Sequence, residues 1–441
     1  MRAASNQPSK LRPACRKQAV GIRSDRRPCV PHSFGYERGG VRARNMVISK
    51  PRIPPARSSI TDKSKSKSKM RSLGSSPLLL LALLLRPPTV SAHPHPHPHP
   101  HPPASGSAAS EVSECSTVAA GRMYALGGNA VDAAIATTLC VGTIAHHHSG
   151  IGGGGFALVR LPGGGGMHFV DFRETAPKRA HERMFVDGGN SSLVGGLAAA
   201  VPGELRGLEE LSRRWGRLDW ELLFGPAVEY AEKGFTVNRD LDAAGNTTTY
   251  PFLLGEDTWR RDWAPHGERV ALGEKMYRKR YARTLRAIAK GGADVFYTGA
   301  MARRTVHEVR RRGGVLAVQD LEGYRVRHRR VAAARYKRFR LSTGSAPSSG
   351  AVMLSALKIF EGWADAHDKG LEAHRLVEGI KFAYGQRTQL GDPDFVDGLD
   401  EFQREMVSEE VAARVRARIR DDGVLPNISS YGTQGMASAM P

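Results

Sequence analysis

The sequence has no hydrophobic run long enough to span a membrane. Its most apolar stretch covers residues 78–85, whereas a membrane-spanning helix needs about 20 apolar residues. This stretch is too short for that role. A hydrophobic content of 40% is nevertheless typical of a soluble globular protein, and residues 111–441 are numerous enough to bury a large core.

Acidic residues are scarce, with 43 Asp and Glu against 65 Lys and Arg, for a formal net charge of +22. The excess sits mostly in residues 1–110, because residues 111–441 carry 45 basic and 40 acidic side chains. A nucleic-acid-binding domain should carry its basic surface on the folded unit. We therefore expect no nucleic-acid partner, and we expect the basic clusters at 310–312, 327–330 and 335–338 to be solvated faces; binding of an anionic surface through them is the alternative.

The first 110 residues do not resemble a folded domain. Residues 1–69 are rich in Arg, Lys, Ser and Pro, which predicts a disordered basic leader or an over-extended start. Residues 70–92 contain a basic start, a Leu run and small residues near Ala92, which predicts a cleaved secretory signal peptide; an uncleaved anchor, the only membrane contact we expect, is the alternative. Residues 93–110 begin with alternating His and Pro, which favours a stiff linker over a copper or zinc site.

Cysteine is also rare, with four residues in the chain. Cys15 and Cys29 fall in the leader, so Cys115 and Cys140 remain in the body. An even pair that follows a signal peptide favours one disulfide, with a buried free pair as the alternative. We expect no metal site and no cofactor.

Three Asn-x-Ser/Thr sequons predict glycosylation at Asn190, Asn246 and Asn427. Such acceptors are used in the secretory pathway. Together with the signal peptide they predict an extracellular, vacuolar or membrane-surface location.

The body, residues 111–441, shows a hairpin followed by many helices. Residues 130–145 predict a buried helix capped by Asn129, and residues 156–161 and 167–172 predict a β-hairpin that leads into Arg173. Strands in one part and helices in another favour an α+β arrangement. Further helices are predicted over 203–233, 280–312, 350–367, 370–391 and 403–420, with few strands among them.

Two local patterns suggest a ligand site, but the residues around them do not support one. Gly150, Gly152 and Gly155 fit G-x-G-x-x-G, but a dinucleotide fingerprint needs a strand before it and a helix after it. Here the predicted order is reversed. Residues 146–148 are three consecutive histidines, which we interpret as a loop run because no second ligand cluster accompanies them.

A series of ordered motifs resembles the γ-glutamyltransferase (glutathione hydrolase) family, in a fungal-like form. The resemblance covers roughly residues 111–435 and is carried by GGNAVDAAIA at 127–136, SGIGGGGF at 149–156, DFRETAP at 171–177, VPGELRG at 201–207, APSSG at 346–350 and LGDP at 390–393. It implies an N-terminal-nucleophile hydrolase with an αββα four-layer sandwich. It also implies a precursor that cuts itself before a Thr into a large and a small subunit, and glutathione and other γ-glutamyl compounds as substrates.

The resemblance assigns roles to individual residues. Arg173 matches the family arginine that holds the α-carboxylate of the γ-glutamyl group, a task that suits a planar guanidinium. The alternative is that Arg173 only pairs with Asp171 or Glu174. Cys115 and Cys140 match a disulfide of animal members.

The chain departs from the family at the nucleophile. The family's catalytic Thr opens a motif of the form Thr-x-His-x-Ser-Val, which is absent from this sequence, and Thr433 lacks the required His. We therefore assign no catalytic residue in this chain. We expect a large-subunit portion whose four-layer sandwich is incomplete without the small subunit, so that the chain alone is inactive and aggregation-prone. A related acylase and a catalytically dead remnant that acts only in binding are the alternatives.

Overall fold

The computed structural model describes residues 106–186, 189–363 and 368–432, without the side chains of Gly189 and Asn190. The predicted leader, signal peptide and most of the His-Pro linker therefore lie outside the described residues, as do Cys15, Cys29 and Thr433. The glycosylation predicted at Asn190 also lies outside them.

The described part of the chain is a mixed α and β structure with three small sheets. The strands are β1 (Gly155–Arg160), β2 (Met167–Phe172), β3 (Phe235–Thr236), β4 (Lys275–Met276), β5 (Arg327–Arg329), β6 (Val331–Tyr336) and β7 (Phe339–Gly344). Antiparallel pairing gives a three-stranded sheet in the order β1-β2-β5 and the two-stranded sheets β3-β4 and β6-β7.

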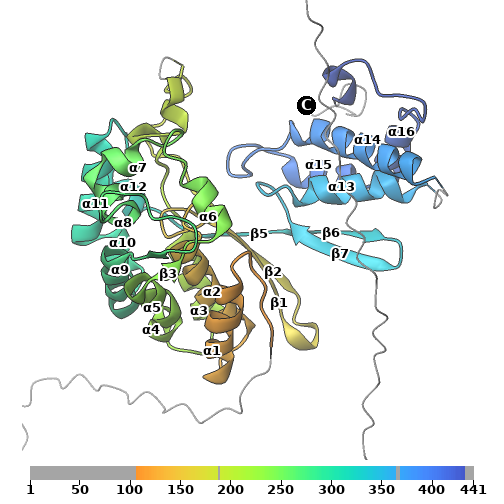
Figure 1. Cartoon of the computed structure of the whole chain (residues 1–441). Helices are drawn as coiled ribbons and strands as arrows, with labels where there is room; N and C mark the ends of the chain where they lie inside the picture. Colours follow the sequence, from red (N-terminus) through yellow and green to blue (C-terminus); the bar gives the residue numbers. More distant parts are fainter. Residues whose placement is uncertain (1–105, 187–188, 364–367, 433–441) are drawn as a thin grey trace, which may run out of the picture. The chain divides into compact units, whose positions relative to one another are not determined.

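Helices supply most of the remaining regular structure (Figure 1). The α-helices are α1 (Ala120–Ala125), α2 (Ala130–Ile144), α3 (Glu204–Trp215), α4 (Trp220–Leu223), α5 (Gly225–Lys233), α6 (Arg239–Ala244), α7 (Phe252–Gly255), α8 (Asp257–Trp263), α9 (Lys279–Gly291), α10 (Asp294–Tyr297), α11 (Gly299–Arg311), α12 (Val318–Glu322), α13 (Gly350–Glu361), α14 (Lys369–Arg387), α15 (Leu399–Met406) and α16 (Glu409–Arg416). Short 3-10 or π turns are η1 (Cys115–Ala119), η2 (Pro162–Gly164), η3 (Gly189–Ser192), η4 (Gly196–Ala198) and η5 (Ile428–Tyr431).

Helix α2 forms where the sequence predicts a buried helix. The Asn129 side chain accepts hydrogen bonds from the Val131 and Asp132 amides, and the Asp132 carboxylate accepts one from the Asn129 amide at 2.7 Å. This reciprocal pair satisfies amides that the first helical turn leaves without partners. At the other end, the Arg278 guanidinium donates to the Gly142 and Thr143 carbonyl oxygens at 3.1 Å. Both ends of the helix are thus fixed by side chains.

A disulfide ties α2 to the start of the described chain. Cys115 and Cys140 are both fully buried and are bonded to each other, with their Cα atoms 5.5 Å apart. The predicted pair is therefore present in the structure. Cys115 begins η1, and Cys140 lies in the second half of α2. The disulfide therefore links these two helices covalently within the buried core.

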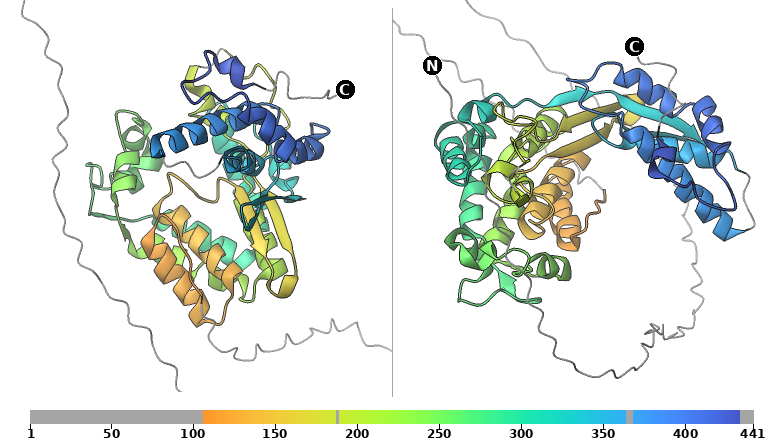
Figure 2. Two further views of the ribbon diagram at one scale, coloured as in Figure 1. Left: turned by 90° about the vertical axis from the view of Figure 1, so that its right-hand side faces the viewer. Right: turned by 90° about the horizontal axis from the view of Figure 1, so that it is seen from above.

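The β1–β2 hairpin also forms as predicted, with Gly155 opposite Phe172 and Arg160 opposite Met167. Strand β2 covers the predicted residues, and β1 begins and ends one residue early. Figure 2 shows α1 and α2, in orange, beside the yellow-green strands in both views. Helix α3 packs on β2, where Gly207 leaves room for the Phe172 ring.

Two features of the second half differ from the prediction. Strands β5, β6 and β7 were not expected, because basic residues and Ala hide the apolar alternation that marks a strand. The helices predicted over 280–312 and 403–420 are each divided, the first after Gly291 and the second at Ser408, whose hydroxyl caps α16 by accepting from the Val411 amide. A polar residue that competes for backbone hydrogen bonds favours a cap over a helix interior.

Helix α13 connects the β6–β7 hairpin with the C-terminal helices. It contacts both strands and also α14, α15 and α16 (Figure 1). A small core of Ile359, Phe382, Val415 and Tyr431 joins α13, α14, α16 and η5. Within the described ranges, no helix has the length and apolar character needed to cross a bilayer.

Candidate functional site

The glycine-rich segment 150–155 forms a turn between α2 and β1. The order is helix, turn, strand, as predicted, which is the reverse of a dinucleotide fingerprint. The start of α3 fixes the turn, because the Gly153 carbonyl accepts hydrogen bonds from the Gly203 and Glu204 amides at 2.8 and 3.0 Å. At Gly154 a Cβ would overlap the Phe172 carbonyl, so glycine permits the turn to lie directly against the end of β2.

Arg173 leaves β2 at this point and lies between two cavities. One, of about 770 Å³, is bordered by Ile151 and Gly152 of the glycine turn together with Arg173 and Glu174. The other, of about 580 Å³, borders the same segment and includes Asp171, Arg173 and Asp392. The arginine that the sequence singles out therefore borders a cleft formed in part by the glycine turn.

The Arg173 side chain is exposed, and its guanidinium has no hydrogen-bond or ion-pair partner among the residues that the structure describes. Asp171, one of the two partners considered from the sequence, is engaged elsewhere. Its Oδ2 accepts from the Arg329 guanidinium at 2.9 Å, and its Oδ1 accepts from the main-chain amide of Arg173 at 3.0 Å. The guanidinium N–H donors of Arg173 are thus available to an external anion.

Arg329 was predicted to be part of a solvated basic cluster, and this was wrong. Its side chain is only 10% exposed and binds three carboxylates, those of Asp171 at 2.9 Å, Asp392 at 3.1 Å and Asp394 at 2.7 Å. A buried cation that satisfies a buried carboxylate is a structural element rather than a surface charge. The sequence offered one signal, since Asp392 belongs to the LGDP motif, but nothing along the chain connects that motif to β5.

Glu204 is a buried acid behind the glycine turn. It is 3% exposed, and its Oε1 has no partner among the described residues. Burial raises the pKa of this carboxyl to about 7, although the Gly150 amide and the Ser149 hydroxyl, 3.4 Å from Oε2, oppose the rise. The sequence did not single out this residue, because a Glu in the first turn of a helix is ordinarily a solvated favourable charge.

The three histidines 146–148 lie in the turn after α2. His146 is partly buried and contacts the Trp263 ring, with ring centroids 5.4 Å apart. Burial and the nearby Arg278 charge lower the pKa of His146 to about 3, so its imidazole is neutral. Across the described ranges no three His, Cys, Asp or Glu side chains are grouped to hold a metal ion.

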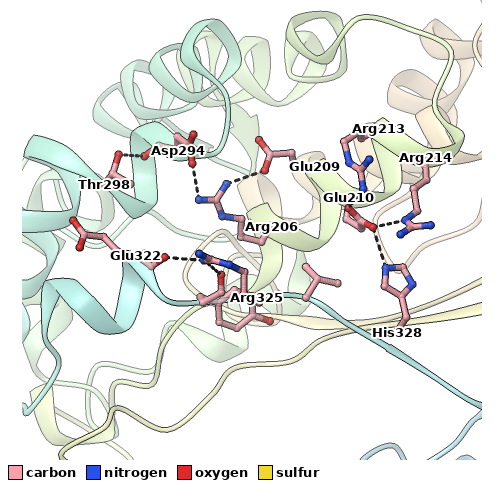
Figure 3. Close-up of a pocket in the computed structure, with 12 residues that line it drawn as sticks. Arg206, Glu209, Glu210, Arg213, Arg214, Asp294, Thr298, Glu322, Arg325 and His328 are labelled. Atoms are coloured by element: carbon pink, nitrogen blue, oxygen red, sulfur yellow. Dashed lines mark hydrogen bonds and ion pairs between the residues drawn. The ribbon is translucent and has the colours of Figure 1, made fainter.

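A separate cavity of about 570 Å³ is lined by charged residues of α3, α10 and β5 (Figure 3). Arg206 binds Glu209 at 2.9 Å and Asp294 at 2.6 Å. Glu210 accepts from Arg213, Arg214 and His328, and these bonds lower its pKa to about 2 even though burial opposes the change. Most arginine side chains that line this cavity therefore already have hydrogen-bond or ion-pair partners within the chain.

Two of the predicted glycosylation acceptors lie within the described chain. Asn246 and Asn427 are both exposed. Asn246 lies in the loop after α6, where its Oδ1 accepts from the Thr248 and Thr249 amides at 2.9 and 3.1 Å. Asn427 immediately precedes η5.

Comparison with known proteins assigns the chain to a family. The family model described as gamma-glutamyltranspeptidase matches residues 115–439. The chain belongs to the γ-glutamyltranspeptidase family. Within this family, the structure matches that of γ-glutamyltranspeptidase from Helicobacter pylori with a TM-score of 0.70 and 28% identity, over 76% of this chain and 96% of that one.

Fungal members of the γ-glutamyltranspeptidase family are more similar in sequence. A glutathione hydrolase proenzyme of Arthroderma benhamiae is 41% identical over 349 residues, and a glutathione hydrolase of Aspergillus flavus is 40% identical over 338 residues. The alignments cover 76% and 75% of this chain but 59% and 56% of those proteins. The chain therefore spans somewhat over half the length of these relatives.

Proposed function

We propose that the protein to which this chain belongs is a γ-glutamyltransferase, or glutathione hydrolase. It cleaves the γ-glutamyl amide of glutathione and its conjugates, and it passes the γ-glutamyl group to water or to an amino acid or peptide. The nucleophile is the N-terminal Thr of a small subunit from the same precursor, and its own α-amine serves as the base. This chain supplies the binding side of the site.

The observation that carries the proposal is the Arg173 guanidinium beside the glycine turn, which has no partner among the described residues. A planar guanidinium offers two parallel N–H donors that match the two oxygens of a carboxylate. A γ-glutamyl group presents one free carboxylate, on its α-carbon, when the γ-carboxyl is in amide linkage. The cavity of about 770 Å³ has the size of an ordinary small-molecule site.

The edge of the main sheet supports the proposed small subunit. Within the described residues β1 pairs only with β2, so no strand is hydrogen-bonded to its other edge. Phe156 and Leu158 on one face of β1 are 36% and 38% exposed. An uncovered edge with exposed apolar side chains favours association with another strand or chain. We infer that the small subunit covers this edge, and that the chain without it is inactive and aggregates.

Secretion completes the proposal. We infer that residues 70–92 are a signal peptide and that Asn190, Asn246 and Asn427 are glycosylated, with the mature domain extending over 111–441. Two of these acceptors are exposed in the structure. Mass spectrometry of the secreted protein before and after glycosidase treatment tests each site.

The decisive experiment compares two donors that differ in one group. L-γ-glutamyl-p-nitroanilide carries the α-carboxylate, whereas 4-aminobutyryl-p-nitroanilide lacks only that group. We expect the complete precursor to cleave the first donor at least about a hundredfold faster in kcat/KM, because the charge-assisted pair between Arg173 and the carboxylate is lost with the second. Replacing Arg173 with Met removes that preference.

Two outcomes contradict the proposal. If the precursor prefers 4-aminobutyryl or other acyl donors that lack the α-carboxylate, the protein is an acylase of the same fold. If the precursor cleaves none of these donors, the chain serves in binding alone. Release of p-nitroaniline measures all three cases on one scale.

A further inference from the structure

The main chain of Arg173 is hydrogen-bonded on both sides, while its guanidinium has no partner in the part of the chain that the structure describes. The Asp171 carboxylate accepts from the Arg173 amide at 3.0 Å, and the Tyr324 hydroxyl donates to the Arg173 carbonyl at 2.8 Å. Two residues further along, Thr175 and Val201 exchange a pair of amide–carbonyl bonds of 3.2 and 2.9 Å. The peptide planes on either side of the Arg173 Cα are therefore fixed, and so is the direction in which its side chain leaves the backbone.

Tyr324 is built into this position. It lies just after α12, is 4% exposed, and stacks on the Tyr297 ring with centroids 6.0 Å apart. At Gly203 a Cβ would overlap the Tyr324 hydroxyl, so the glycine of the VPGELRG motif leaves the space that the hydroxyl occupies. Burial keeps the pKa of Tyr324 well above its ordinary value, and the hydroxyl remains a hydrogen-bond donor at any physiological pH.

We propose that Tyr324 is a positioning residue for the binding of the substrate α-carboxylate, acting through the main chain of Arg173. The inference rests on the proposed function. The guanidinium lies at the end of a long side chain. A small rotation of the 173–174 peptide changes the direction of the Cα–Cβ bond and therefore displaces the guanidinium by a larger distance. A displacement of about 1 Å at a binding group is enough to remove a large part of its contact with the substrate.

The alternative is that Tyr324 stabilises the fold without affecting Arg173. The two roles predict different kinetics. Loss of a general structural contact lowers the amount of folded enzyme and affects all donors equally. Loss of positioning raises KM for donors with an α-carboxylate, since the lost contact is made equally in the ground state and the transition state.

The test replaces Tyr324 with Phe, which removes the hydroxyl and keeps the ring. Tyr431→Phe is the matched control, because the Tyr431 hydroxyl is also buried and donates to the Glu378 carboxylate at 2.6 Å, away from Arg173. In the complete precursor we expect Tyr324→Phe to raise KM for L-γ-glutamyl-p-nitroanilide about tenfold with kcat changed less than about twofold. KM for the 4-aminobutyryl donor and both constants of Tyr431→Phe stay unchanged.

A second readout does not depend on turnover. Hydrogen exchange followed by mass spectrometry on peptides that cover residues 170–177 reports the hydrogen-bonded amides of Arg173 and Thr175. We expect exchange to be at least about fivefold faster in Tyr324→Phe than in the parent and in Tyr431→Phe. An unchanged KM in an active enzyme, or unchanged exchange in this peptide, overturns the inference. If the parent cleaves no γ-glutamyl donor, the proposed function fails, and the exchange measurement alone decides whether Tyr324 holds this segment.

Discussion

The two arginine-lined cavities of this protein differ in how their charges are compensated. In the cavity between α3 and β5, Arg206 binds two carboxylates and Glu210 accepts from Arg213, Arg214 and His328 (Figure 3). In the cavity beside the glycine turn, Arg173 has an exposed guanidinium without a partner in the described residues. Paired charges stabilise the fold, while an unpaired guanidinium on a fixed backbone is suited to bind an external anion.

The contrast extends to the residues that surround Arg173. Arg329 and Asp171 form a largely buried pair, and the Asp171 carboxylate also accepts a hydrogen bond from the Arg173 amide. The paired charges of Arg329 and Asp171 thus support the main chain from which the Arg173 guanidinium extends. The following predictions test this difference, and all of them are measured on the complete precursor as free energies of unfolding in urea.

Arg329→Ala should have the largest effect. It leaves the Asp171 carboxylate, 6% exposed, without its cation, and removing one partner of a buried pair costs about 4 kcal/mol. Arg330→Ala is the matched control on the neighbouring residue, because Arg330 pairs with Asp400 at a site where both side chains are more than half exposed. We expect the control to change stability by less than about 1 kcal/mol. Equal losses in the two variants would show that burial of Arg329 is unimportant.

Glu204→Gln should follow, with an effect that depends on pH. The folded state holds the pKa of Glu204 at about 7, above the ordinary value of 4.5, so the folded protein binds the proton more tightly. The parent therefore loses stability as pH rises from about 4.5 to about 7, by roughly 3 kcal/mol from this group.

Glu204→Gln lacks this loss, since its amide does not ionise. The difference in stability between parent and variant should therefore change by that amount between pH 5 and pH 8, in favour of the variant at pH 8. The parent and the variant share every other titrating group, including the neighbouring Glu174 and Tyr281. A difference that stays constant with pH would mean that Glu204 is ionised throughout.

Arg206→Gln should have a smaller effect. Its guanidinium has two carboxylate partners and lies over the Tyr297 ring at 4.6 Å, but Asp294 is largely exposed. Exposed ion pairs contribute little, and we expect a loss of about 1 kcal/mol that decreases in high salt. A double-mutant cycle with Asp294→Asn isolates the pair. A coupling energy near zero would remove the ion pair from the account of this cavity.

Arg173→Gln should have the smallest effect on stability, below about 0.5 kcal/mol, because the side chain has no partner to lose in the described structure. Its consequence should appear in substrate binding alone. A loss as large as that of Arg206→Gln would indicate that Arg173 has a structural partner, and the comparison between the two cavities would fail.

Local sequence patterns predicted the parts of the fold that depend on near neighbours. The Asn129 cap of α2 and the β1–β2 hairpin form at the expected residues because their hydrogen bonds join positions a few residues apart. The two cysteines of the body are bonded to each other, as their even number suggested. The strands β5 to β7 could not be predicted in this way, since β5 is stabilised by pairing with β2, more than 150 positions earlier.

The sequence by itself determined the family and the identity of the arginine at the end of the hairpin, because both are encoded in short motifs. Only the tertiary structure decided which arginine lacks a partner among the described residues. Arg173 and Arg329 are the same residue type. Asp171, Asp392 and Asp394 form ion pairs with Arg329, whereas Arg173 has no partner among the described residues. The free energy of a charge depends on the partners and the solvent around it, and these are assembled only when distant segments of the chain meet.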